Sequence, residues 1–188
     1  MTVSITSICN RALQHLGASR ILGITDDTRN GRACNACYDA LRRSELRRHR
    51  WLFAKTRVAL APLVETDPHG EFTYIFQLPA DCLRVLKPRD HTLDWQILGR
   101  KLYTNQSSVL YLEYISDVSD PNQFDALFAE SLAYKMAETM CEEITQSNVK
   151  KVGIKDDYKE MIREAKRTNA METIPAEPED DAWVNIRN

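Results

Sequence analysis

The sequence predicts an α+β chain that is mainly helical: a four-helix bundle with an inserted small antiparallel β domain and an extended C-terminal arm. Apolar residues recur at helical spacing before residue 55 and after residue 120, and short alternating segments lie between them. Beyond Met171, acidic residues and Pro follow without periodicity, which is typical of an arm. The predicted units are residues 1–55 and 121–170 for the helical bundle, 56–120 for the β domain and 171–188 for the arm.

The first two helices are predicted from their caps and their apolar stripes. Ser4, with Thr2 as the alternative, caps the first helix, and Gly17 ends it. Side-chain oxygens of residues 26–28 cap a longer second helix that runs to about His49. We expect these two helices to pack antiparallel. The residues expected to be buried are Ile5, Ile8, Cys9, Ala12, Leu13 and Leu16 in the first helix and Ala33, Cys37, Tyr38 and Leu41 in the second.

Residues 56–120 alternate between apolar and polar side chains and are punctuated by Pro and Gly, which predicts short strands. Gly99 and Arg100 lie between two such segments and predict a tight hairpin turn. The expected strands are 58–60, 72–78, 83–86, 93–98, 102–104 and 109–115.

Two further helices follow the strands. Asp120, Pro121 and Gln123 predict the start of the third, because an N-cap Asp, a Pro at the first helical position and a capping-box Gln coincide. The start of the fourth helix is left open, because Gly153 interrupts its pattern. The apolar faces are Phe124, Leu127, Phe128, Leu132, Met136, Met140 and Ile144 in the third helix and Tyr158, Met161, Ile162 and Ala165 in the fourth.

Charge is distributed unevenly along the 188 residues, although the net charge is only −2. Residues 1–55 hold ten Lys and Arg against four Asp and Glu, whereas residues 121–188 hold nine against fourteen. Complementary halves of this kind can pair within one fold or between neighbouring copies. No apolar run approaches the roughly 18 residues of a membrane span, and the N-terminus lacks the apolar core of a secretory signal. A cytoplasmic or virion location is expected.

The sharpest basic feature lies at the end of the second predicted helix, where five Arg residues surround His49. A nucleic-acid contact, a solvated helix face with bridges to acidic helices, and pairing with a neighbouring subunit are the three interpretations. The Arg residues spread around about a turn and a half of helix, so they do not share one face. They are Arg42, Arg43, Arg47, Arg48 and Arg50.

Signatures of catalysis are absent from the sequence: it has no phosphate-binding loop, dinucleotide-binding turn, zinc-protease pair or nucleophile elbow. Cys34 and Cys37 form a CxxC pair, but no second pair supplies the remaining ligands of a zinc site. We interpret both thiols as helix-packing residues and expect no enzyme activity, no cofactor and no metal.

Trp183, Val184 and Ile186 stand out because they are large apolar residues on the acidic arm. Such a segment is typical of one that becomes ordered on a partner. The alternative is a disordered terminus without a partner.

One ordered series of residues runs through the predicted helices and strands: Ile8, Cys9, Asn10, Ala12, Leu13, Leu16, Gly17, Tyr38, Leu46, Arg47, Trp51, Phe53, Ala54, Leu78, Pro79, Asp81, Cys82, Leu83, Arg84, Val85, Gly99, Phe124, Ala133, Ala137, Tyr158 and Ala165. This series covers roughly residues 3–170 and resembles the head-to-tail adaptor of short-tailed bacteriophages, also called tail tubular protein A. The residues after Met171 do not align with that family.

The resemblance implies a virion structural protein rather than an enzyme. It implies a dodecameric ring at the head–tail junction that joins the portal protein to the tail nozzle, with DNA passing through its channel without sequence-specific binding. The subunit can be a monomer in the host cytoplasm before assembly.

Two sets of site residues are predicted by combining this ring with the charge pattern of the chain and with the apolar residues of the arm. We expect Arg43, Arg47 and Arg50 of one subunit to pair with Glu138, Glu142 and Glu143 of the next. We expect Trp183, Val184 and Ile186 to bind the portal. The alternative function is a DNA-binding regulatory protein that uses the Arg-rich second helix.

Overall fold

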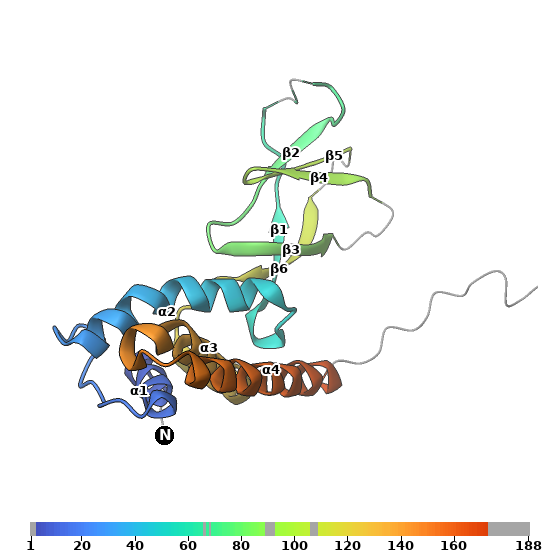
Figure 1. Ribbon diagram of the computed structural model, residues 1–188. Helices are drawn as coiled ribbons and strands as arrows, with labels where there is room; N and C mark the ends of the chain where they lie inside the picture. The colour runs from blue at the N-terminus through green and yellow to red at the C-terminus, as the bar shows by residue number, and fades with distance from the viewer. Residues whose placement is uncertain (1–2, 66, 68, 89–92, 106–108, 173–188) are drawn as a thin grey trace, which may run out of the picture.

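The computed structural model describes residues 3–172 except 66, 68, 89–92 and 106–108. Within that part, helices and strands occupy separate regions (Figure 1). The chain is therefore of mixed α+β class, as the sequence predicts. The helices are α1 (Ile5–Leu16), α2 (Arg29–Arg48), α3 (Ala126–Thr145) and α4 (Asn148–Met171), with two short 3-10 helices, η1 (Leu52–Ala54) and η2 (Pro121–Gln123).

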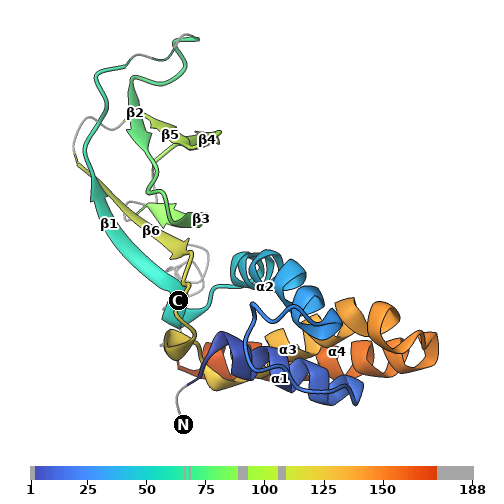
Figure 2. The same ribbon diagram turned by 90° about the vertical axis from the view of Figure 1, so that its left-hand side faces the viewer.

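The strands form two small antiparallel sheets on one side of the helices (Figure 2). One sheet has the order β1-β6-β3 and the other β2-β5-β4. Leu98 pairs with Lys101 across the turn between β4 and β5, and Gly99 adopts φ 61°, so the predicted hairpin is confirmed. The strands are β1 (Lys55–Leu60), β2 (Tyr74–Gln77), β3 (Cys82–Pro88), β4 (Trp95–Leu98), β5 (Lys101–Thr104) and β6 (Leu110–Ser116).

The caps of α1 and α2 are those that the sequence predicts. Ser4 and Ser7 form a capping box at the start of α1, and Gly17 ends the helix in the left-handed conformation with φ 64°. The Thr28 hydroxyl accepts a hydrogen bond from the Gly31 amide and begins α2. These ends are local features, and so neighbouring residues suffice to predict them.

The predicted start of the third helix is wrong by several residues. Asp120 caps only η2, and the backbone is extended at Phe124. Asp125 is the N-cap of α3: its carboxylate accepts hydrogen bonds from the amides of Leu127 and Phe128 at 2.9 and 3.1 Å. Asp120 and Asp125 are both capping residues and lie five positions apart. The helix is interrupted between them, where Phe124 is buried against Phe128. The start of α4, left open by the sequence, is capped by Ser147.

α3 is the central helix, and α1, α2 and α4 all pack against it. Arg29 at the start of α2 donates a hydrogen bond to the Glu143 carbonyl near the end of α3. At the other end, Trp51 packs edge-on against Phe128, with ring centroids 5.0 Å apart. α2 and α3 therefore run antiparallel. The contact expected between α1 and α2 is small, because α1 buries its apolar stripe mainly against α3.

Two separate hydrophobic cores result from this arrangement. The helical core contains the fully buried Trp51 and Phe128 and collects residues from all four helices. The sheet core lies between the strands and contains Phe76, Leu102 and Leu112. The chain passes between the two regions twice, through η1 into β1 and from β6 into η2.

Candidate functional site

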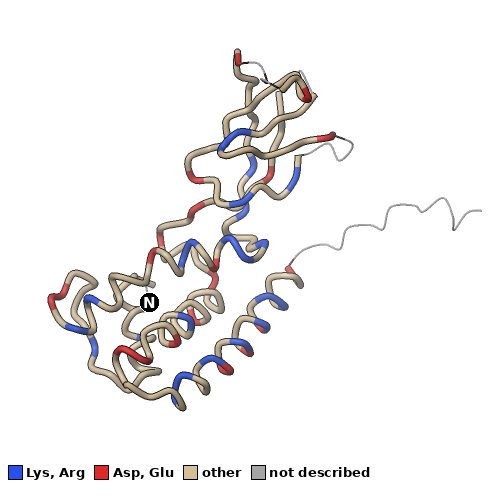
Figure 3. Tube along the Cα trace, turned by 45° about the horizontal axis from the view of Figure 1, so that its top comes forward, with Lys and Arg blue, Asp and Glu red and all other residues tan. Residues whose placement is uncertain are grey.

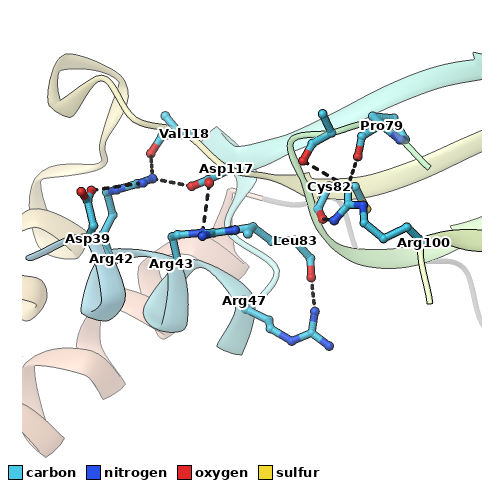
Figure 4. Close-up of polar contacts among 11 residues, drawn as sticks. Asp39, Arg42, Arg43, Arg47, Pro79, Cys82, Leu83, Arg100, Asp117 and Val118 are labelled. Atoms are coloured by element: carbon cyan, nitrogen blue, oxygen red, sulfur yellow. Dashed lines mark hydrogen bonds and ion pairs between the residues drawn. The ribbon is translucent and has the colours of Figure 1, made fainter. Parts of the chain in front are cut away.

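Arg42 of α2 lies at the junction between helices and strands, and its side chain is only 6% exposed. Its Nη1 donates hydrogen bonds to the Asp117 carboxylate at 2.5 Å and to the Val118 carbonyl at 2.6 Å (Figure 4). Both partners belong to the segment that leads from β6 to η2. The buried guanidinium therefore attaches the exit from the strands to α2.

Arg43 and Arg47, two residues of the predicted basic interface, also contact their own chain. Arg43 pairs with Asp117 through Nε at 3.1 Å, and Arg47 donates a hydrogen bond to the Leu83 carbonyl in β3 (Figure 4). Arg100 from the β4–β5 turn binds the carbonyls of Pro79 and Cys82 just before and within β3. Arg43 and Arg47 thus help to position the strands, and a subunit contact would have to use the rest of their exposed surface.

Arg50, the third predicted basic residue, is exposed and makes no side-chain hydrogen bond or ion pair with any residue that the structure describes. It lies beside His49, where burial lowers the pKa of the imidazole and the positive charges of Lys166, Arg50 and Arg84 lower it further. These groups give the end of α2 a positive surface, which we call the basic end: Arg47, His49, Arg50, Arg84 and Lys166. In Figure 3 basic residues follow one another at this end of α2, next to the strands.

Stability is expected to fall as the pH drops from 7 to 5. Burial lowers the pKa of His15, as it does that of His49, although Glu130 at 3.1 Å opposes the shift at His15. Well above pH 6.5 both rings are neutral in the folded and unfolded chains, so they do not change the stability. Below that pH the unfolded chain binds protons first and is favoured. Urea unfolding at several pH values measures how the free energy of unfolding changes with pH.

The matched variant for this prediction is the double replacement His15→Gln and His49→Gln. Its stability should be flat over the same window, because the carboxylates with lowered pKa, such as Glu113, titrate below about pH 4.5. An equal slope in both proteins would contradict the assignment to these two histidines.

The three predicted acidic residues lie along the second half of α3. Glu138 is largely covered and pairs with Lys135 at 2.7 Å, so it is the least available of the three. Glu142 is exposed and pairs with Lys151 at 3.0 Å. Glu143 is exposed, and its carboxylate makes no ion pair with the described residues.

Exposed apolar side chains lie at the same end of the helices as Glu142 and Glu143. Leu22 is 97% exposed in the loop before α2, and Val149 is 86% exposed in the first turn of α4. Lys150 donates a hydrogen bond to the Leu16 carbonyl at 2.7 Å, which places the start of α4 beside the end of α1. Val152, also in α4, is 60% exposed. We call this surface the acidic end after its two exposed carboxylates, although Arg29, Lys150 and Lys151 lie at the same end and bind carbonyls or Glu142. Its members are Leu22, Glu142, Glu143, Val149 and Val152.

The fold keeps the basic and acidic sets apart. Because Arg29 contacts Glu143, the acidic end lies at the start of α2, whereas Arg47 and Arg50 lie at its other end. Eighteen residues of helix separate Arg29 from Arg47, which is about 27 Å at 1.5 Å per residue. Arg50 and Glu143 therefore cannot pair within one chain, and their pairing between copies stays a prediction.

A buried polar cluster was missed by sequence reasoning. Glu45 of α2 is only 1% exposed, and its carboxylate accepts hydrogen bonds from the Tyr158 hydroxyl at 2.8 Å and from Arg48 at 3.1 Å. Burial raises the pKa of Tyr158, and the neighbouring Glu45 carboxylate raises it further. The cluster links α2 to α4. Glu45 follows Arg42 by three positions in the sequence, so a helix places the two residues on the same face. The sequence does not show that this face is buried.

Cys34 and Cys37 lie on α2, where Cys34 is buried near Cys9 of α1. Its hydrogen bond with Cys9 lowers the pKa of Cys34, whereas burial raises the pKa of Cys37 to about 12. No group of three or more His, Cys, Asp or Glu side chains could hold a metal ion in the described part of the chain. Trp183, Val184 and Ile186 lie outside the described residues.

Two further findings concern membrane crossing and similarity to known proteins. Among the helices described, none combines the length and the apolar character that a membrane crossing requires. A comparison with protein-family models finds no match, and a comparison with curated proteins finds none either.

Proposed function

We propose that this chain is the subunit of a virion ring, a head-to-tail adaptor that joins the portal protein to the tail nozzle and lets the genome pass through its channel. In this proposal the four helices form a bundle from residues 1–55 and 121–170, and residues 56–120 form an inserted β domain. The two separate hydrophobic cores support that division.

The observation that carries the proposal is the placement of unmatched groups at opposite ends of α2. A ring requires two different surfaces on each subunit that complement each other. At the basic end, Arg50 makes no ion pair with the described residues. At the acidic end, the Glu143 carboxylate makes none either, and the exposed Leu22 and Val149 lie at that same end. A head-to-tail contact between copies would match the charges and cover the apolar groups.

The junction supports the same assignment, because a ring that connects two partners must hold its two regions in a fixed relation. Arg42 binds the Asp117 carboxylate and the Val118 carbonyl, and Arg47 binds the carbonyl of Leu83. These bonds connect α2 to both the entry of β3 and the exit of β6.

Electron microscopy of the purified chain mixed with portal rings tests the function directly. We expect a second collar below the portal with one chain per portal subunit, and no collar when the portal is omitted at low protein concentration. Portal rings that remain bare at saturating chain would contradict the adaptor function.

The DNA-binding alternative makes a different prediction. Each of four Arg residues contacts its own chain: Arg42 and Arg43 pair with Asp117, Arg47 binds the Leu83 carbonyl, and Arg48 pairs with Glu45. Arg50 is the cation of the group without an ion pair among the described residues. A regulator would bind one duplex sequence more tightly than others, with an affinity that falls steeply with salt. Fluorescence anisotropy with several duplexes separates the two functions, because the adaptor should show no preference among them.

A further inference from the structure

A groove with a volume of about 650 Å³ runs along the outer face of the β1-β6-β3 sheet. Among the described residues that line it, Lys55 and Arg57 of β1 and Lys87 of β3 are basic, and Glu113 of β6 is acidic. Lys55 and Arg57 lie 2.9 and 3.0 Å from Glu113, so one negative charge faces two positive ones. Tyr111, which is 53% exposed, contributes an aromatic surface. The groove therefore fits an acidic segment that carries a large apolar side chain.

The end of α4 lies next to the base of this groove. The Asn169 side chain accepts a hydrogen bond from the Leu52 amide at 2.9 Å and donates one to the Arg50 carbonyl at 3.1 Å. Leu52 precedes Lys55 by three residues, which is at most about 11 Å of chain. The segment after α4 thus starts within one short span of the groove.

Residues 173–188 have the complementary chemistry. They contain four acidic residues and one basic residue, and the acids come just before Trp183. Sixteen residues can span up to about 53 Å, which is more than twice the length of the six-residue strand β1. Because the segment is tethered beside the groove, its effective concentration there is on the order of millimolar, so even a weak contact is populated. The acids in question are Glu177, Glu179, Asp180 and Asp181.

We propose that residues 173–188 occupy the sheet groove of their own chain, with the acids on Lys55 and Arg57 and with Trp183 against Tyr111. This inference goes beyond the adaptor function and does not depend on it, since it requires one chain only. If the chain is an adaptor, the portal must take the segment from the groove, so the segment stays covered until a partner competes for it.

Quenching of Trp183 in the full chain by acrylamide tests the proposal. Trp95→Phe removes the partly exposed indole of β4, and Trp51 is fully buried. We expect Trp183 to be protected relative to a free peptide of residues 173–188, and we expect the protection to be lost in Arg57→Glu. The Arg57 side chain is 80% exposed, so this change should leave the fold intact. Lys155→Glu on α4, exposed and away from the groove, is the matched control and should change nothing.

A second variant leaves residues 1–172 unchanged. Replacing the four acids of the segment by Gln or Asn should abolish the protection, and high salt should weaken it in the unaltered chain. Equal quenching of Trp183 in the full chain and in the free peptide would overturn the proposal, as would protection that survives both sets of replacements. Protection that disappears on dilution would assign the groove to a second copy and overturn the same-chain contact.

Discussion

Arg50→Glu is expected to prevent the chain from forming a collar on portal rings. Arg50 is exposed, and its guanidinium has no partner among the described residues, so the replacement should leave the stability of the monomer unchanged. In the proposed ring it would bring like charges together at every subunit contact. One exposed pair contributes only about 1 kcal/mol, but the loss is repeated around the ring. Electron microscopy of portal mixtures counts the rings that carry a collar.

The charge-swapped variant makes this prediction specific. Glu143→Arg alone should also prevent assembly, whereas Arg50→Glu combined with Glu143→Arg should restore it, because each contact would again join opposite charges. Arg163→Glu on α4, exposed and outside both ends, is the control and should assemble normally. Assembly of Arg50→Glu to the level of the unaltered chain would contradict the proposed contact. Arg47 is less suitable for this charge reversal, because replacing it would also remove its hydrogen bond to the Leu83 carbonyl within the chain.

Arg42→Ala is expected to lower the free energy of unfolding by about 3 kcal/mol. The change removes a buried guanidinium that binds both Asp117 and the Val118 carbonyl, and it leaves that buried carbonyl without this donor. It also leaves a void between α2 and the segment after β6. Urea unfolding followed by circular dichroism measures the loss.

Arg43→Ala is the matched control for this second prediction. Arg43 binds the same Asp117 carboxylate, yet its side chain is 57% exposed, so its removal should cost less than about 1 kcal/mol. Arg42→Lys keeps the charge but not the planar fork, and we expect an intermediate loss. Equal losses of stability in Arg42→Ala and Arg43→Ala would show that burial does not determine how much each of these Arg residues contributes to the free energy of unfolding.

The sequence determined the features that depend on neighbouring residues alone. Ser4 with Gly17 and Thr28 with the residues after it mark helix ends, because a cap is a hydrogen bond within a few positions. The turn at Gly99 follows from its positive φ in the same way. Local information did not suffice to predict the start of α3, because Asp120 and Asp125 are both suitable N-caps. The helix begins after Asp125, and Phe124 packs against Phe128 at that point.

Only the tertiary structure decided which charges are buried and which remain available. Arg42 and Arg43 are adjacent and chemically identical, but the first is buried and the second exposed. A guanidinium leaves water only where partners replace its hydration, and those partners, Asp117 and Val118, lie some 75 residues away in the sequence. The composition therefore determined that the chain has complementary charged parts, whereas the antiparallel packing of α2 on α3 placed them at opposite ends, where pairing requires another copy.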